Sequence, residues 1–119
     1  LEIKNINVIT DSFGNDKNKY DVVFCGAIIH WIWSLTSNFN SFEKILNYLN
    51  NITNNILLIE WISENDNAIK SFGHIKENKE NYKTYNFEKT LIKYFKIINK
   101  IETDNKNRIL YITEKYHHQ

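Results

Sequence analysis

The chain has 119 residues, a formal net charge of +1 and a hydrophobic content of 42%. This length gives one domain, residues 1–119, with a single core, and the apolar content excludes a disordered chain. The lysines are spread along the sequence, which excludes the basic patch of a nucleic-acid-binding protein, and no apolar run approaches the ~20 residues of a membrane span. Cys25 is the single cysteine, so we expect no disulfide and a cytoplasmic protein.

The first third of the chain predicts two strands. Residues 3–10 alternate loosely between apolar and polar side chains and predict a strand, and the polar residues 11–19 predict a loop. A continuous apolar run over residues 21–26 predicts a second strand, because strands buried on both faces lack polar alternation. Residues 31–40 form an irregular aromatic stretch.

The middle of the chain predicts a helix followed by a central strand. Ser41 is suited to cap a helix whose apolar residues, from Phe42 to Leu49, recur at helical spacing. Asn50 and Asn51 tolerate left-handed geometry and are expected to end that helix. Residues 56–62 form a second continuous apolar run and predict another strand of the sheet.

The last third predicts two helices and a hairpin. Residues 63–72, with Ser63 as the cap, suit a short helix, and residues 73–84 predict a charged loop. Asn86 is expected to cap the next helix. Two β-rich runs on either side of residues 103–107 predict a hairpin, which places one antiparallel strand in an otherwise parallel sheet.

The run from Asp21 to Trp31 is the most informative stretch of the sequence. Its apolar strand ends in Gly26 and Ala27, small residues that let a ligand approach the backbone closely, and His30 follows. In open α/β sheets, ligands bind at this carboxyl end of the strands. The stretch resembles the fourth strand of class I S-adenosylmethionine (SAM)-dependent methyltransferases.

Other segments are similar to the same family. The order of elements, with its final hairpin, is typical of the carboxyl-terminal half of a class I methyltransferase. Residues 57–62, which include Glu60 and Trp61, resemble the fifth strand of a group of bacterial methyltransferases, and residues 107–111 resemble their last strand. The resemblance implies an α/β, Rossmann-like fold with a mostly parallel sheet that ends in an antiparallel hairpin strand.

The family's glycine-rich cofactor loop is not found in this sequence. None of Gly14, Gly26 and Gly73 belongs to a Gly-x-Gly, and the opening strand corresponds best to the family's third strand. We therefore expect an incomplete methyltransferase fold that lacks the first two strands. Because such a fold would expose strand edges and apolar faces, we expect the chain to join a missing amino-terminal half or another chain.

The resemblance implies that SAM is the cofactor and that Asp11, Cys25, Gly26 and Ala27 bind it. Asp11 stands where the family often has an acidic residue that accepts the adenine amino hydrogen, although a loop Asp can also bond its own backbone. The strand end at Cys25–Ala27 would line the cofactor, or Cys25 would simply pack as a small apolar residue. His30 is a candidate general base, because imidazole titrates near pH ~6.5, or it positions the loop.

Further residues are candidates for catalysis or for substrate contact. Glu60 interrupts an apolar strand, so its carboxylate either meets substrate or pairs with His74 or Lys70, and His74 either joins it in the cleft or is solvated. Trp31, Trp33 and Trp61 are expected to form an aromatic wall for a sugar or a planar substrate, with core packing as the alternative for at least one of them. No metal ligand set is expected.

These residues lead to two functional hypotheses. The first is a SAM-dependent methyltransferase domain that transfers a methyl group to a hydroxyl of a small molecule, such as a sugar. The alternative is a truncated, non-catalytic methyltransferase-like module that serves protein association, because the glycine-rich loop is missing.

Overall fold

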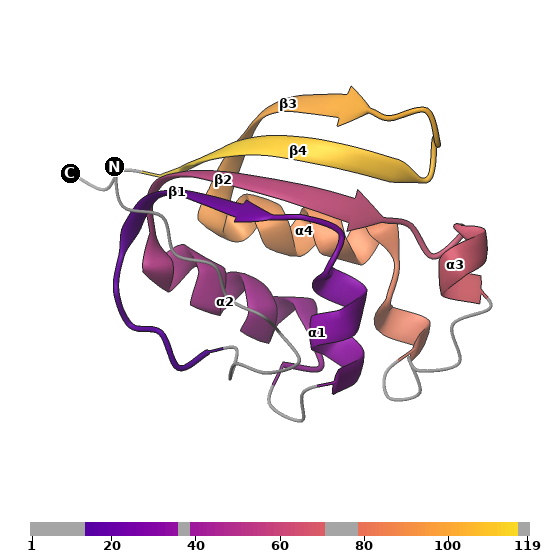
Figure 1. The fold of residues 1–119 in the computed structure, drawn as a ribbon, viewed down its shortest axis with the longest axis horizontal. Helices are drawn as coiled ribbons and strands as arrows, with labels where there is room; N and C mark the ends of the chain where they lie inside the picture. Colours follow the sequence, from indigo (N-terminus) through magenta and orange to yellow (C-terminus); the bar gives the residue numbers. More distant parts are fainter. Residues whose placement is uncertain (1–13, 36–38, 71–78, 117–119) are drawn as a thin grey trace.

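The computed structural model describes residues 14–35, 39–70 and 79–116, which form one mixed α/β unit (Figure 1). In chain order the elements are β1 (Tyr20–Cys25), α1 (Ile29–Leu35), α2 (Phe42–Ile52), β2 (Thr53–Ile62), α3 (Asn67–Lys70), the 3₁₀ turn η1 (Lys79–Asn81), α4 (Thr84–Tyr94), β3 (Phe95–Glu102) and β4 (Arg108–Lys115).

The described strands form one sheet in the order β1-β2-β4-β3. β1 pairs with β2 in parallel, with Cys25 opposite Ile59, whereas β4 runs antiparallel to both β2 and β3. β3 therefore runs in the same direction as β1 and β2, and β4 is the antiparallel strand. The antiparallel hairpin strand is as the sequence predicts, but the described sheet is mixed rather than mostly parallel, because β1–β2 is its one parallel pair.

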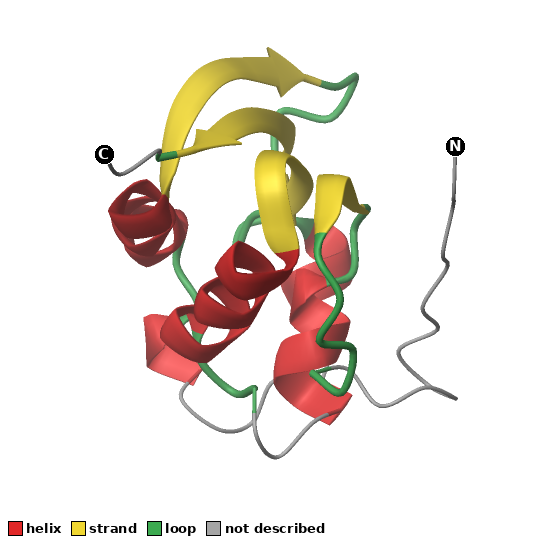
Figure 2. Cartoon of the chain, turned by 90° about the vertical axis from the view of Figure 1, so that its left-hand side faces the viewer, coloured by secondary structure: helices red, strands yellow, loops and turns green. Residues whose placement is uncertain are grey.

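Helices α1, α2 and α4 all lie on one face of the sheet (Figures 1 and 2). Side chains alternate along a strand, and on β2 Leu57, Ile59 and Trp61 are fully buried beneath these helices. The helices match this surface because their apolar residues recur at helical spacing, as with Ile45 and Leu49 of α2. The core thus lies between the sheet and a single layer of helices.

No described element covers the other face of the sheet, which we call the open face (Figure 2). The alternation and the strand register assign to it the following residues: Val22 and Phe24 of β1, Ile56, Leu58, Glu60 and Ile62 of β2, Arg108, Leu110, Ile112 and Glu114 of β4, and Lys96, Asn99 and Ile101 of β3. Most of these side chains are apolar.

Trp61 occupies the centre of the aromatic core. Its ring stacks on Phe87 at 4.4 Å between centroids and on Tyr82 at 4.9 Å, and its indole Nε1 donates to Thr84 Oγ1 at 3.0 Å. The ring of Phe42 packs edge-on against Trp61 at 5.4 Å. This cluster joins β2 to α2, to the residue that follows η1 and to helix α4.

One helix was not predicted, and another begins at a different residue than predicted. The first part of the aromatic stretch is helix α1, since Ile29, Ile32 and Trp33 share one buried helical face. Helix α4 begins at Thr84, and Asn86 does not cap it: the Asn86 amide donates to Asn81 O at 3.1 Å.

The predicted end of α2 and the predicted start of α3 are wrong. Ser41 caps α2 and accepts from Lys44 N at 3.3 Å, as predicted. That helix continues to Ile52 and passes into β2 through Thr53, whose backbone is extended and not left-handed. Ser63 does not cap a helix, because α3 begins only at Asn67. The strand predicted at residues 3–10 lies outside the described residues.

Candidate functional site

The candidate site lies where the parallel strands β1 and β2 end. β1 ends at Cys25, opposite Ile59, and β2 continues to Ile62, so the turn after β1 runs beside the last residues of β2. Ala27 in this turn has φ 49°, a left-handed conformation that costs an alanine about 1 kcal/mol. Strained backbone of this kind concentrates at binding sites and tight turns. The binding site predicted at the carboxyl end of β1 is therefore a tight turn whose first two residues are Gly26 and Ala27.

Gly26 leaves room for a neighbouring aromatic ring. A Cβ added to Gly26 would lie 2.6 Å from Cε1 of Phe24, so any side chain here would displace the ring. Together, Gly26 and Ala27 present mostly backbone at the end of β1. This is the geometry by which a strand end can approach a flat ligand closely.

Cys25 contributes its backbone but not its thiol to this edge. The thiol is buried in the core, and burial raises its pKa to about 12. Since the thiolate is the nucleophilic form, Cys25 is chemically inert in the folded protein. Its predicted role in lining a cofactor is thus restricted to main-chain contact.

His30 lies in the first turn of α1, directly after the Gly26-Ala27 turn. Its side chain is buried, and burial together with the nearby positive charge of Arg108 lowers the pKa of the imidazole to about 4. The negative charge of the Asp66 carboxylate acts in the opposite direction and raises this pKa. The imidazole is therefore neutral at pH ~7, the form in which it can accept a proton. The ring of Trp31 lies 5.5 Å from that of His30 and is partly exposed.

Asp66 and Arg108 belong to the same edge of the sheet, and sequence reasoning missed both. The buried Asp66 carboxylate accepts from Asn105 Nδ2 at 2.8 Å and from Arg108 Nε at 3.3 Å. These bonds hold the β3–β4 hairpin turn against the segment between β2 and α3. One signal was available in the sequence, since Arg108 is its single arginine.

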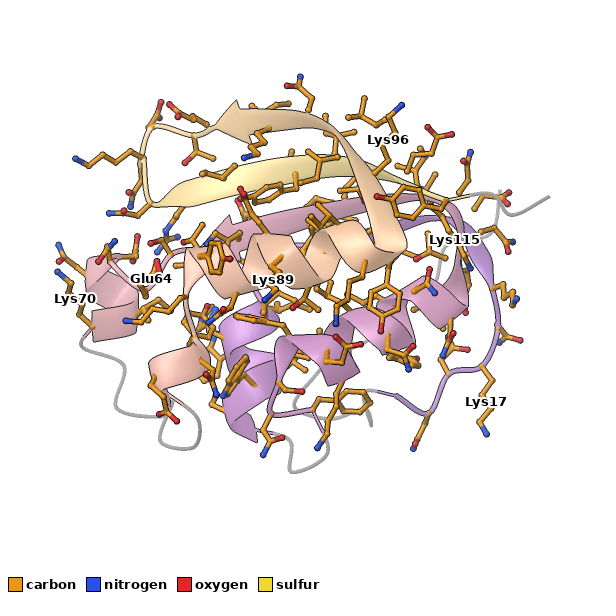
Figure 3. The ribbon with its side chains drawn as sticks, turned by 180° about the vertical axis from the view of Figure 1, so that it is seen from behind. Lys17, Glu64, Lys70, Lys89, Lys96 and Lys115 are labelled. Atoms are coloured by element: carbon orange, nitrogen blue, oxygen red, sulfur yellow. The ribbon has the colours of Figure 1, made fainter. Side chains whose placement is uncertain are left out.

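Glu64 connects the end of β2 to the start of α4 (Figure 3). Its carboxylate accepts from Thr84 N at 2.7 Å, from Thr84 Oγ1 at 2.8 Å and from Ser63 Oγ at 3.0 Å. Burial raises the pKa of Glu64, but these hydrogen bonds outweigh burial and leave the pKa below its ordinary value. Glu64 acts as the missing cap of α4, which Lys83 at the N-cap position does not supply.

Glu60 lies near the carboxyl end of β2, as the sequence predicts. Its side chain is on the open face, two residues before the end of the strand and opposite Leu110 of β4. Its carboxylate makes no hydrogen bond or ion pair with a described residue, so the expected pairing with Lys70 is not formed. The other expected partner, His74, lies outside the described residues, as does Asp11.

The three candidate tryptophans differ in exposure, and Trp33 is buried against Phe42 in the core. Trp61 is 0% exposed, so its stacked ring offers no surface to a substrate and belongs to the core. Trp31 keeps part of its ring exposed beside His30 and stays a candidate for substrate contact. Of the predicted residues, the structure therefore brings together Gly26, Ala27, His30 and Trp31.

A surface hollow of about 290 Å³ lies elsewhere, between α2 and α4, and of the predicted site residues only Trp33 lines it. Within residues 14–35, 39–70 and 79–116, no group of three or more His, Cys, Asp or Glu side chains is arranged to hold a metal ion. No helix in these ranges is both long and apolar enough to cross a bilayer.

Comparisons with known proteins show a likeness in fold. No family model matches the chain, and no curated protein matches its sequence. Among solved structures, the chain is similar to magnesium protoporphyrin IX methyltransferase from Synechocystis PCC 6803, which was crystallised with S-adenosylhomocysteine (SAH) bound. The TM-score is 0.57 at 15% sequence identity, and the match covers 87% of this chain and 48% of that chain. The chain thus has a methyltransferase-like fold and spans about half the length of this structural relative.

Proposed function

We propose that this chain is part of a SAM-dependent methyltransferase that transfers a methyl group to a hydroxyl of a small molecule, such as a sugar. The observation that carries the proposal is the fold likeness over 87% of the chain to a methyltransferase crystallised with SAH. The turn at Gly26 and Ala27 supports it, because a tight turn with little side chain ends a parallel strand where ligands of open α/β sheets bind.

The chemistry of methyl transfer suits a site with few charged groups. The acceptor oxygen attacks the methyl carbon, the bond from carbon to sulfur breaks, and its electron pair returns to sulfur. Alignment of oxygen, carbon and sulfur supplies most of the acceleration. The acceptor's proton passes to a base or to water, and neutral His30 is the candidate base at this edge. Trp31, beside His30, is the candidate substrate contact.

The cofactor site needs more than this chain is seen to supply. The sequence has no Gly-x-Gly loop, and 48% coverage leaves about half of the structural relative without a counterpart here. We propose that a further segment, from the same polypeptide or from another chain, completes the site, and that Asp11 and His74 contribute to cofactor and substrate binding.

Calorimetric titration with SAH tests the proposal, on the 119-residue chain and on the longest natural polypeptide that contains it. We expect stoichiometric binding by the longer form. Gly26→Val should abolish this binding because its side chain fills the turn, whereas Lys106→Val, at an exposed turn position, should not change it. Absence of binding by both folded forms would reject the cofactor and favour the non-catalytic association module.

A further inference from the structure

Arg108 places a positive charge at the edge of the sheet that carries the proposed site. It is the first residue of β4 and pairs with Ile62, the last residue of β2, so it lies at the edge where β1, β2 and β3 end (Figure 1). Because β2 alone separates β4 from β1, the backbone of Arg108 lies two strand spacings, roughly 10 Å, across the sheet from the turn after β1. A small molecule can span this distance.

The guanidinium of Arg108 is held at one nitrogen and open at the other two. Its Nε donates to Asp66 Oδ2 at 3.3 Å, and the buried Asp66 carboxylate is fixed further by Asn105 Nδ2 at 2.8 Å. The Arg108 side chain is 38% exposed, and its terminal nitrogens Nη1 and Nη2 donate to no acceptor among residues 14–35, 39–70 and 79–116. A guanidinium held in this way can form two parallel hydrogen bonds to a planar carboxylate.

Arg108 lies near the proposed base. Its positive charge contributes to the lowered pKa of His30, and because a Coulomb interaction weakens with distance, the guanidinium and the imidazole belong to one site. The ring of Trp31 lies 5.5 Å from that of His30 and is partly exposed. A cation, a neutral base and an aromatic ring are thus brought together at this edge of the sheet.

The other charged residues at this edge limit the anion that Arg108 can bind. Among the described residues they are mostly acidic: Glu60, Glu64, Asp66, Lys70, Glu102, Asp104 and Lys106. Lys96 lies at the opposite end of the hairpin, where it pairs with Glu114 in the strand register. Asp66 already offsets part of the charge of Arg108, and a dianion such as a phosphate monoester would be repelled by the remaining carboxylates. A single carboxylate is therefore the anion that suits Arg108.

We infer that the methyl acceptor is a small hydroxy acid whose carboxylate is bound by Arg108. The two terminal nitrogens of the guanidinium donate to the two carboxylate oxygens, the body of the acceptor lies against the exposed part of Trp31, and its hydroxyl is directed toward His30. Arg108 determines the specificity, and Asp66 is the positioning residue that fixes the guanidinium. The inference rests on the proposed function, because it names the substrate class of that same site.

Two probes, para-hydroxybenzoate and para-hydroxybenzamide, test the inference, because they have the same shape and differ in charge. Each is titrated at neutral pH and constant ionic strength into the longest natural polypeptide that contains the chain, with and without SAH, and binding is followed by NMR. We expect the acid to bind at least about tenfold more tightly than the amide, because hydrogen bonds between charged groups are the stronger ones. The resonances of Arg108 Nε and Trp31 Nε1 should shift as the acid binds.

Three variants separate recognition of the acid from a merely structural role of Arg108. Arg108→Gln should remove the preference for the acid, but it also removes a bond that holds the hairpin turn. Asn105→Ala is the matched control, because it removes the other side-chain bond between this turn and Asp66 and keeps the cation. Asn105→Ala should retain the preference, as should Lys106→Gln, which removes an exposed cation from the same turn. If Asn105→Ala loses the preference as fully as Arg108→Gln, Arg108 only holds the turn and the inference is wrong.

The outcomes distinguish this inference from the proposed function. Equal binding of the two probes by the native protein, or binding of neither, would overturn the inference. Tighter binding of phenyl phosphate than of para-hydroxybenzoate would also overturn it and indicate a dianionic substrate. If the preference and its loss in Arg108→Gln occur without SAH binding, the acid site stands and the proposed function fails. If SAH binds and no preference is found, the proposed function stands and this inference fails.

Discussion

The Glu64→Gln substitution tests whether one carboxylate fastens α4 to the sheet. In the native protein the two carboxylate oxygens accept three hydrogen bonds, two from Thr84 and one from Ser63. Glutamine keeps a single acceptor oxygen and turns an NH₂ group toward these donors. Hydrogen bonds to a charged acceptor contribute ~1.5–3 kcal/mol, against ~1 kcal/mol for neutral ones. Because the hydroxyls can reorient, we expect a loss of about 1–2 kcal/mol in the free energy of unfolding.

Urea and thermal unfolding followed by circular dichroism measure this loss. For a domain of this size, we expect the melting temperature to fall by about 4–8 °C. Glu80→Gln is the matched control, because Glu80 is exposed in the η1 turn and makes no bond to a described residue. Its stability should stay within about 0.5 kcal/mol of the native value.

The pH dependence provides an independent check on Glu64. Its pKa is lowered in the folded protein, so its contribution to stability is present above the ordinary glutamate pKa and is lost as pH falls through the lowered value. The difference between the native protein and Glu64→Gln should therefore shrink on acidification. If Glu64→Gln and Glu80→Gln are equally stable at neutral pH, Glu64 does not fasten α4.

Three further predictions concern buried groups. The pKa of His30 is lowered to about 4, so its contribution to the free energy of unfolding is fully present above the ordinary histidine pKa and is lost on acidification. Between about pH 7 and about pH 5, urea titrations should show that the native protein loses ~1–2 kcal/mol more stability than His30→Gln. Because burial raises the pKa of the Cys25 thiol to about 12, it should react with a disulfide reagent at pH ~8 only at the rate of unfolding; rapid labelling of the folded protein would contradict this. Trp61→Phe removes the bond to Thr84 and part of the stack on Phe87, so it should cost about 1–2 kcal/mol by denaturant unfolding, while an unchanged midpoint would place Trp61 outside the core.

Local patterns in the sequence were sufficient for most of the elements. Continuous apolar runs predicted β1 and β2, and five turn-forming residues between β-rich runs predicted the β3–β4 hairpin. These signals are local, because neighbouring residues alone set strand periodicity and turn chemistry. Helix boundaries were less accurate, since α4 begins where the distant Glu64 caps it rather than at Asn86.

The candidate site shows the same division. The sequence by itself determined that Gly26, Ala27 and His30 follow a buried strand, because residue order and composition fix this. Only the tertiary structure decided that Trp61 is core, because Phe87 and Tyr82 stack on it from other segments.

The protonation state of His30 and the location of Glu60 also depended on tertiary structure. Arg108 lies far from His30 in the sequence, yet its charge lowers the pKa of the imidazole. Glu60 lies on the open face because the pairing of β2 with its neighbours decides which alternate residues face the helices. Burial, charge proximity and the choice of sheet face arise from contacts between distant segments, and a local sequence pattern contains no record of those contacts.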